Sequence, residues 1–365
     1  SDLPLERLTG NLSARGRLLN IRKNGVKGQR HIVNVTSTDL QAKLDASQDQ
    51  RAIGITGNGD AEIDLIGGEL SVFDVRFDGR VDTQDVPDGL LSISAAGTPQ
   101  LISIRKLDYS GEAGAVNAKG VIDLRDNIGW SVTGRFDNFD VGYFLPNNPA
   151  ILTGDLVTSG EWQQPASTAA NRQGKLQRFA VNFDGVLDAE QLPAGKLTID
   201  ASGDAQLIRI KRFRHVGAAG SIDAKGSVDV RQGIAWDINA TMDRFNLGYF
   251  LKDTPSTITG SIKTDGRWGE TQQVINLQQI NLRGMLKGQP LSAKGSLSAK
   301  LSLPKDLGSY FERLQAQDSE TQYKQVNALI DSLDANDLVL RWGDNYLTAN
   351  GNAKQLQAKI NITSL

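Results

Sequence analysis

The sequence predicts an all-β protein built mainly from antiparallel sheet, and two observations carry this prediction. Apolar and polar residues alternate with a period of two along nearly the whole chain, as in the run from Ile53 to Leu65. Glycine is abundant, with 38 residues, whereas aromatic residues make up only 6% of the chain. Because successive side chains of a strand point to opposite faces, each alternating segment has one apolar and one polar face. Parallel strands covered on both sides would instead show continuous apolar runs.

The composition of the 365 residues excludes several classes of protein. The chain has no cysteine, which excludes disulfide scaffolds, iron–sulfur clusters and cysteine-type zinc sites. Its formal net charge is -2, so nothing in the charge balance predicts binding to nucleic acid. No window approaches the ~18 consecutive apolar residues that a membrane-spanning helix needs.

An internal repeat organises the chain. Residues 68–162 align without a gap on residues 174–268, a constant offset of 106 positions (174 minus 68), and about two in five aligned residues are identical. Each copy has room for some seven or eight strands. Landmarks that recur at this offset are Trp130 and Trp236, Trp162 and Trp268, and the GYFL segments at 142–145 and 248–251.

The repeat, and the change from alternating to more widely spaced apolar residues toward the C-terminus, predict how the chain divides into segments. These are a β segment at 1–67, the first copy at 68–162, a polar loop at 163–173, the second copy at 174–268, a degenerate third copy at 269–303, a helical insertion at 304–337 and terminal strands at 338–365. The helical prediction, centred on 307–333, comes from apolar residues at longer spacing, such as Tyr323, Val326 and Ile330. Ser319 and Gln322 fit a capping box that opens its second helix.

The apolar faces of the strands allow two interpretations. In the first, two halves of the fold press together and bury their apolar residues, as in a sandwich. In the second, the face lines an open trough, because glycine and alanine alternating with aliphatic residues leave volume that a native core would fill. The candidate lining residues are Val116, Ala118, Ile122, Leu124, Trp130, Val132, Phe136, Ile222, Ala224, Val228, Val230, Trp236, Ile238, Met242, Ile258 and Ile262.

Several segments resemble a known family. The strands LTGNLSARGRL and PAILTGDLVTSGEW, the recurring GYFL and the late LRWGDNYLTANG look like those of the TamB family of AsmA-like envelope proteins. The resemblance implies an elongated sheet curled into a U-shaped groove (a β-taco) with a hydrophobic interior. It also implies a section from the middle of a long protein of the Gram-negative periplasm. An inner-membrane anchor would precede this section, and a region outside it would meet a TamA-like outer-membrane barrel.

The same resemblance implies a role in moving phospholipids between the two membranes, with their acyl chains as the occupants of the groove. It also implies an alternative role in assembling outer-membrane β-barrel proteins and autotransporters, as a scaffold or chaperone. A third hypothesis, an adhesin-like β-solenoid, would require a repeat of ~20–30 residues, which the sequence lacks.

No residues are predicted to be catalytic, to bind a metal or to hold a cofactor, and we expect the chain not to be an enzyme. The sequence has no GxSxG, Walker A, HExxH or EF-hand motif. Asp123 and Asp229 recur beside turns, where aspartate stabilises bends. Lys119 and Lys225 recur on the polar face as solvated lysines or as contacts for a phosphate headgroup. The GYFL segments are either a groove lip or anchors at the end of the sheet.

Overall fold

The computed structural model describes residues 5–46, 49–83, 87–143, 149–164, 174–189, 192–249, 254–269, 272–302, 329–352 and 354–363. The chain divides into two compact units, Ser1–Glu190 and Gln191–Leu365. This boundary falls inside the second copy of the repeat and not between the two copies.

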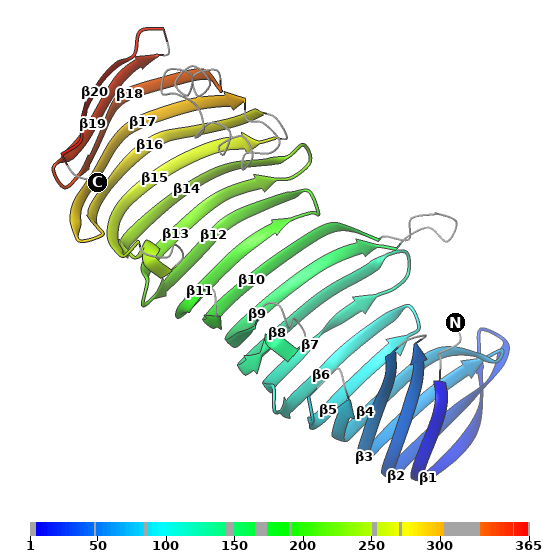
Figure 1. The fold of residues 1–365 in the computed structure, drawn as a ribbon. Helices are drawn as coiled ribbons and strands as arrows, with labels where there is room; N and C mark the ends of the chain where they lie inside the picture. The colour runs from blue at the N-terminus through cyan, green and yellow to red at the C-terminus, as the bar shows by residue number, and fades with distance from the viewer. Residues whose placement is uncertain are drawn as a thin grey trace. The chain divides into compact units, whose positions relative to one another are not determined.

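The first unit is an antiparallel sheet whose strands lie side by side in chain order (Figure 1). Each described strand pairs with the next one along the chain, so the sheet is a simple meander. The strands are β1 (Leu5–Lys23), β2 (Val26–Ala46), β3 (Asp49–Ile66), β4 (Glu69–Thr83), β5 (Gly89–Thr98), β6 (Leu101–Gly111), β7 (Gly114–Asp123), β8 (Ile128–Asp140), β9 (Ala150–Gln163) and β10 (Lys175–Ala189).

The second unit repeats this architecture, again with antiparallel pairing between successive strands. Its strands are β11 (Leu192–Gly203), β12 (Leu207–Gly217), β13 (Gly220–Asp229), β14 (Ile234–Phe245), β15 (Ser256–Trp268), β16 (Gln272–Leu286), β17 (Gln289–Ser302), β18 (Ile330–Trp342), β19 (Asn345–Asn352) and β20 (Gln357–Asn361). One 3₁₀ turn occurs in each unit, η1 (Val141–Tyr143) and η2 (Leu247–Tyr249). The expected all-β, antiparallel fold is confirmed.

The two repeat copies form matching sets of strands. Strands β4–β9 fall in the first copy and β10–β15 in the second, and β4, β6, β7 and η1 match β10, β12, β13 and η2 residue for residue at the offset of 106. Each copy therefore holds six described strands, fewer than the seven or eight expected, because the strands are 10 to 15 residues long.

β-Bulges recur along both sheets at positions where two polar residues separate two apolar ones. In β6 the pairing with β7 jumps from Ile104 to Leu107, and in β12 the pairing with β13 jumps from Ile210 to Phe213. A bulge inserts an extra residue and bends its strand. Without it, a spacing of three would turn the second apolar side chain to the opposite face. The same jump occurs in β8, β14, β16 and β18, and in β2 from Val35 to the polar Thr38.

The bulges of β8 and β14 share one local structure. Asn138 and Arg244 adopt positive φ angles of 47° and 48°. The backbone N–H of Asn138 donates to Thr153 Oγ1 and that of Arg244 to Thr259 Oγ1, both at 2.9 Å. A side-chain hydroxyl therefore satisfies the amide that the irregular ladder leaves unpaired.

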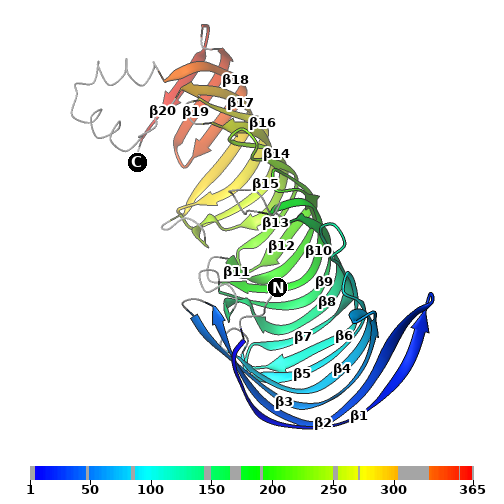
Figure 2. The same ribbon diagram turned by 90° about the vertical axis from the view of Figure 1, so that its right-hand side faces the viewer.

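These bulges, together with the twist of the strands, curve each sheet. Figure 2 shows the long strands β1–β4 of the first unit bowed across their length. In the second unit, strands such as β16 and β17 are also bent in Figure 1. Each sheet taken by itself therefore has a concave and a convex face.

The helix expected at 307–333 requires a correction. Residues 303–328, including the capping box, lie outside the described residues, but Ile330–Trp342 is strand β18 and not helix. Leu333 pairs with Ala299 of β17, and the backbone N–H of Ser302 donates to the carbonyl of Leu329. The backbone groups of β17 form hydrogen bonds with this segment, and this pairing outweighs the helical spacing of its apolar residues.

The bulge geometry predicts a site that requires glycine. Gly114 has a φ of 90°, and a Cβ there would lie 2.2 Å from the carbonyl oxygen of Asn138 in the bulge of β8. We expect Gly114→Ala to lower the free energy of unfolding by about 1–3 kcal/mol, the usual cost of a strained backbone position. Urea unfolding followed by circular dichroism measures this change.

Gly129→Ala is the matched control, since its Cβ would meet nothing closer than 3.5 Å on the neighbouring strands. Equal stabilities of the two variants would show that the bulge imposes no such constraint.

Candidate functional site: the apolar face of each sheet

The strand register gathers the predicted lining residues onto one face of each sheet. In the first unit, Ile122 pairs with Trp130, Ala118 with Gly134, and Val116 with Phe136. Paired residues share a face, as do residues two apart on a strand. One face of the first unit therefore carries Val116, Ala118, Ile122, Trp130, Val132 and Phe136, and one face of the second carries Ile222, Ala224, Val228, Trp236, Ile238, Met242, Ile258 and Ile262.

Two of the predicted lining residues lie just past the ends of strands. Leu124 follows β7 and Val230 follows β13, and their backbone N–H groups donate to the carbonyls of Gln100 and Gln206. Val230 is 47% exposed, whereas Leu124 is half-buried. Both belong to the margin of their sheet and not to its floor.

The apolar face, as we call the face defined by these residues in each unit, is continuous across the strands. In the first unit one row of paired residues runs from β3 to β10 through Ala61, Val75, Ala95, Ile104, Gly120, Val132, Thr158 and Val181. In the second unit the matching row runs from β11 to β19 through Ala201, Ile210, Gly226, Ile238, Thr264, Leu277, Leu297, Ala335 and Gly351. No charged residue interrupts either row.

The side chains of the apolar face are mostly half-buried and do not form a filled core. In β8 the residues from Trp130 to Phe136 alternate between half-buried on this face and exposed on the other. Among the described residues His215 is the one large side chain that is fully buried, at 2% exposure. In the described part of the chain, strands pack chiefly against their sequence neighbours, whereas a sandwich would press one sheet onto another. Within the described residues, no second layer of strands covers either face, and the apolar face is the less exposed of the two.

The best-packed part of this face lies in the second unit. A cluster of buried residues centres on Leu338, which is 4% exposed, and includes Ile280, Ala293, Ala335 and Ala349. Ala293, Ala335 and Ala349 are small, and Ile280 pairs with a glycine. All the members lie on the adjacent strands β16–β19, so the cluster is a thin layer on one sheet and not a contact between two sheets.

Large rings on the apolar face lie flat over glycines, a feature that sequence reasoning missed. A Cβ on Gly160 would lie 2.2 Å from Trp130 Cζ2, and one on Gly79 would lie 2.6 Å from Phe77 Cζ. Tyr109 covers Gly89 and Gly111 in the same way, and His215 covers Gly195 and Gly217. For Phe77, Tyr109 and His215 the signal in the sequence is a glycine two residues after the ring on the same strand. For Trp130 the glycine lies opposite it on the neighbouring strand and becomes visible only once the register is known.

The histidine and tyrosine that replace each other in the repeat thus share a packing role. The Tyr109 hydroxyl donates to the carbonyl of Pro87 at 2.9 Å, and burial raises the pKa of this tyrosine. Tyr109 and His215 are 8% and 2% exposed. The feature common to this position in both copies is a ring that packs on glycine, whereas the chemical group that the ring carries differs.

The opposite face of each sheet carries the charges. Arg30 pairs with Asp64 through Nε and Oδ1 at 2.7 Å, and Arg105 pairs with Asp74 at 2.8 Å. Lys119 and Lys225 are exposed on this face, since their strand neighbours Ala118 and Ala224 lie on the apolar face. Both lysines are therefore placed as solvated residues and lie away from the apolar face.

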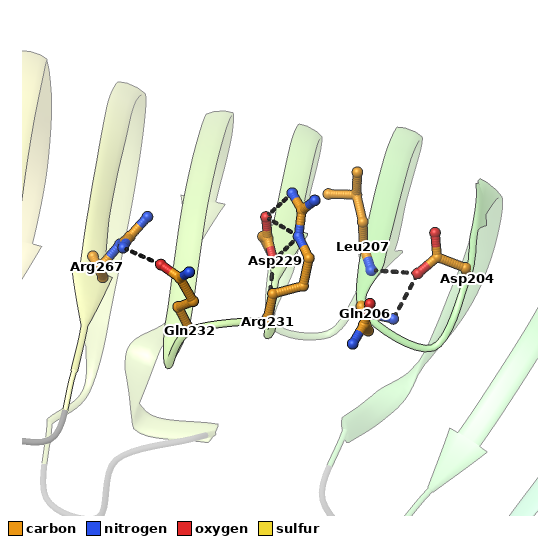
Figure 3. Close-up of polar contacts among 7 residues, drawn as sticks. All are labelled: Asp204, Gln206, Leu207, Asp229, Arg231, Gln232 and Arg267. Carbon is orange, nitrogen blue, oxygen red and sulfur yellow. Dashed lines mark hydrogen bonds and ion pairs between the residues drawn. The ribbon is translucent and has the colours of Figure 1, made fainter. Parts of the chain in front are cut away.

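The recurring aspartates hold turns at one margin of each sheet. Asp229 Oδ1 accepts from the Arg231 backbone N–H and from Arg231 Nε, both at 3.0 Å, as Figure 3 shows. Asp123 and Arg125 make the same contacts in the first unit. Beside this turn, Asp204 Oδ1 accepts from the backbone N–H groups of Gln206 and Leu207 (Figure 3). These carboxylates stabilise bends, as the sequence predicted.

The GYFL segments are described only in their first half. Gly142 and Gly248 donate their backbone N–H groups to Asp140 Oδ1 and Asn246 Oδ1, at 2.8 and 2.9 Å. The tyrosines that follow, Tyr143 and Tyr249, are 47% and 48% exposed. The phenylalanine and leucine of each segment lie outside the described residues, so the choice between lip and anchor stays a prediction.

The described residues offer neither a metal site nor a membrane-spanning helix. In the described ranges, no group of three or more histidine, aspartate or glutamate side chains is placed to hold a metal ion. Within those same ranges, no helix has the length and apolar character that crossing a membrane requires.

The fold and this face define a class: curved antiparallel sheets with one apolar face that no second layer covers in the described part of the chain. A sequence profile described as "TamB, N-terminal domain" matches residues 30–171 and 164–365. Because these matches cover more than half of the chain, it belongs to the TamB family, and the resemblance seen in the sequence is confirmed.

One relative and the solved structures complete the comparison. The chain is 24% identical over 179 residues to "Translocation and assembly module subunit TamB" of Haemophilus influenzae. This match covers 49% of the chain and 12% of that protein, so the chain spans a small part of its relative. No solved structure matches the chain.

The hydrogen bonds of the turn aspartates predict that the stability of the fold falls in acid. Hydrogen bonds from Arg231 lower the pKa of Asp229 to about 2, below the ordinary value of about 3.9. Since the folded pKa is the lower one, this carboxylate stabilises the fold above about pH 4, and that contribution is lost as the pH falls toward 2. Carbon-13 NMR of labelled aspartate should therefore show Asp229 titrating near pH 2.

The Arg231→Ala variant should move the titration midpoint of Asp229 up toward pH 4. Arg125→Ala, the matched change in the other unit, should leave the midpoint of Asp229 unchanged. A wild-type midpoint near 4 would rule out the turn contacts described here.

Proposed function

We propose that this chain is a periplasmic section of a TamB-like envelope protein whose apolar face conducts phospholipids between the inner and outer membranes, without catalysing a reaction. The observation that supports the proposal is the continuous, half-buried apolar face of each sheet, which we take to be its concave side. A protein rarely leaves such a face to water unless something covers it.

Acyl chains fit this face by their chemistry. They are unbranched and apolar, and each methylene transferred from water gains about 0.8 kcal/mol. Binding of this kind needs no polar group at a fixed position. The rows through Val132 and Ile238 offer none beyond the threonines Thr158 and Thr264, whose hydroxyls accept from indole N–H groups.

The charge distribution indicates where the headgroup lies. The ion pairs of Arg30, Arg105 and Arg178 lie on the convex face or near a sheet margin. Burying a phosphate without a partner on the uncharged apolar face would be costly. The headgroup therefore stays at the open side of the groove, in water.

Membership of the TamB family supports the cellular setting of the proposal. We place the whole protein in a Gram-negative envelope, anchored in the inner membrane through a region outside this section. A TamA-like outer-membrane barrel is its proposed partner, again through a region outside this section.

A second function is supported by the printed name of the relative, which describes a translocation and assembly module. In this alternative the sheet is a scaffold for outer-membrane β-barrel proteins and autotransporters, with barrel strands pairing at a sheet edge. It predicts binding of barrel-strand peptides to the purified chain, whereas conduction of lipid predicts co-purified phospholipid.

Charge on the apolar face tests the leading proposal. Ala118→Asp or Ile122→Asp in the first unit, and Ala224→Asp or Val228→Asp in the second, place a carboxylate where an acyl chain would lie. Combining one change from each unit should lower the phospholipid per protein about tenfold or more, measured by mass spectrometry of organic extracts, because an unpaired charge in an apolar contact is costly.

Ser131→Asp is the matched control, because Ser131 is exposed on the opposite face of β8 beside Trp130 and Val132. It should keep the wild-type lipid content. A wild-type chain that carries no phospholipid, or an unchanged content in the charged variants, would contradict the proposal.

A further inference from the structure

We propose that Trp130 and Trp236 are the floors of two equivalent acyl-chain subsites, one in each unit, and that Gly160 and Gly266 keep each indole flat so that a chain passes over it. This inference rests on the proposed function and assigns these four residues a task within it.

The glycines leave no room for any other residue under the rings. A Cβ on Gly160 would lie 2.2 Å from Cζ2 and 2.3 Å from Cη2 of Trp130, and one on Gly266 would lie 2.4 Å from Cζ2 of Trp236. A real Cβ does not approach a ring carbon so closely. Each indole therefore occupies the space that a side chain on the next strand would take.

The one polar atom of each indole is already satisfied within the sheet. Trp130 Nε1 donates to Thr158 Oγ1 at 3.3 Å, and Trp236 Nε1 donates to Thr264 Oγ1 at 3.2 Å. These threonines stand two residues before the glycines on the same strands. The hydrogen bond fixes the position of the indole nitrogen, and the glycine leaves room for the six-membered ring against the strand. The rest of the indole is an apolar surface.

Apolar neighbours continue each platform across the sheet. The row through Trp130 contains Ile102, Ile122, Gly160 and Phe179 in successive strands, and the row through Trp236 contains Ile208, Val228, Gly266 and Ile275. Both tryptophans are half-buried, so part of each ring stays accessible. A flat aromatic surface flanked by aliphatic residues suits an acyl chain and gives no contact to a charged headgroup.

The repeat distinguishes Gly160 from Gly134, another glycine of the apolar face, although glycines such as Gly120 and Gly226 recur as well. Gly134 lies on the same strand as Trp130, and its counterpart in the second copy is Ala240. A Cβ at Gly134 would meet nothing closer than 3.3 Å, so a methyl group fits there. Gly160 and Gly266, which lie beside the rings, are glycine in both copies.

Adding one methyl group beside each ring tests the proposal. In Gly160→Ala/Gly266→Ala each indole must leave the strand surface and rise into the path of the chain. We expect phospholipid per protein, measured by mass spectrometry of extracts from the full 365-residue chain, to fall at least threefold. The rescue uses the first unit alone, because a Cβ on Gly266 would also lie 2.4 Å from the carbonyl oxygen of Val274. Gly160→Ala/Trp130→Ala should bind more phospholipid than Gly160→Ala, since the raised ring is gone, and less than the wild type, since the floor of the subsite is gone too.

Gly134→Ala is the matched control and should keep the wild-type lipid content. An unchanged content in the Gly160→Ala/Gly266→Ala chain overturns the proposal, and so does a Gly160→Ala/Trp130→Ala chain that binds no better than Gly160→Ala. A wild-type chain without phospholipid would instead overturn the proposed function, which keeps the two failures distinct.

A second measurement covers the case in which the glycine variants do not fold. In a chain whose other tryptophans are replaced by phenylalanine, Trp130 fluorescence should be quenched by vesicles of phosphatidylcholine with dibrominated acyl chains. A tryptophan-free chain carrying Ser131→Trp on the opposite face should be quenched at least threefold less. Equal quenching of the two would show that the indole does not meet acyl chains.

Discussion

The register of the antiparallel ladder is the constraint on which the rest of this structure depends. A slip of one residue would send every apolar side chain of a strand to the opposite face. Pairs such as Ile122 with Trp130 and Val228 with Trp236 keep the face aligned from strand to strand. Where the spacing of apolar residues is three and not two, as from Ile104 to Leu107, a bulge absorbs the extra residue and the face continues.

A layer that is apolar on one side and uncovered is costly in water, and the structure reduces this cost only in part. Curvature brings the apolar side chains together, and rings such as Trp130 and Tyr109 lie on glycines instead of standing up. These devices lower the apolar area exposed to water without filling the concave side. Among the described strands no second sheet covers this face, which distinguishes it from half of a sandwich and is the basis of the proposed acyl-chain occupant.

Sequence reasoning reached the fold and the apolar face, because a period of two determines which residues share a face. The placement of Ala118, Ile122, Ala224 and Val228 on one face per unit follows from that period alone. Sequence reasoning did not predict the bulges. Their sequence pattern is a pair of polar residues between two apolar ones, as from Leu277 to Ile280. Sequence reasoning extended a helix through Leu333, because local spacing does not show that the neighbouring strand β17 offers a ladder. The glycines beside Trp130 and Trp236 lie on neighbouring strands, so finding them needs the register between strands, which a single sequence does not contain.

Lipid contact along a single strand tests the central claim most directly. A photoreactive benzoylphenylalanine placed in turn at each position from 130 to 137 of β8 samples both faces of the same ladder. The account predicts crosslinks to phospholipid at 130, 132, 134 and 136 and none at the intervening positions, which carry the polar side chains. Crosslinks at the intervening positions, or equal labelling along the strand, would contradict a lipid path on the apolar face.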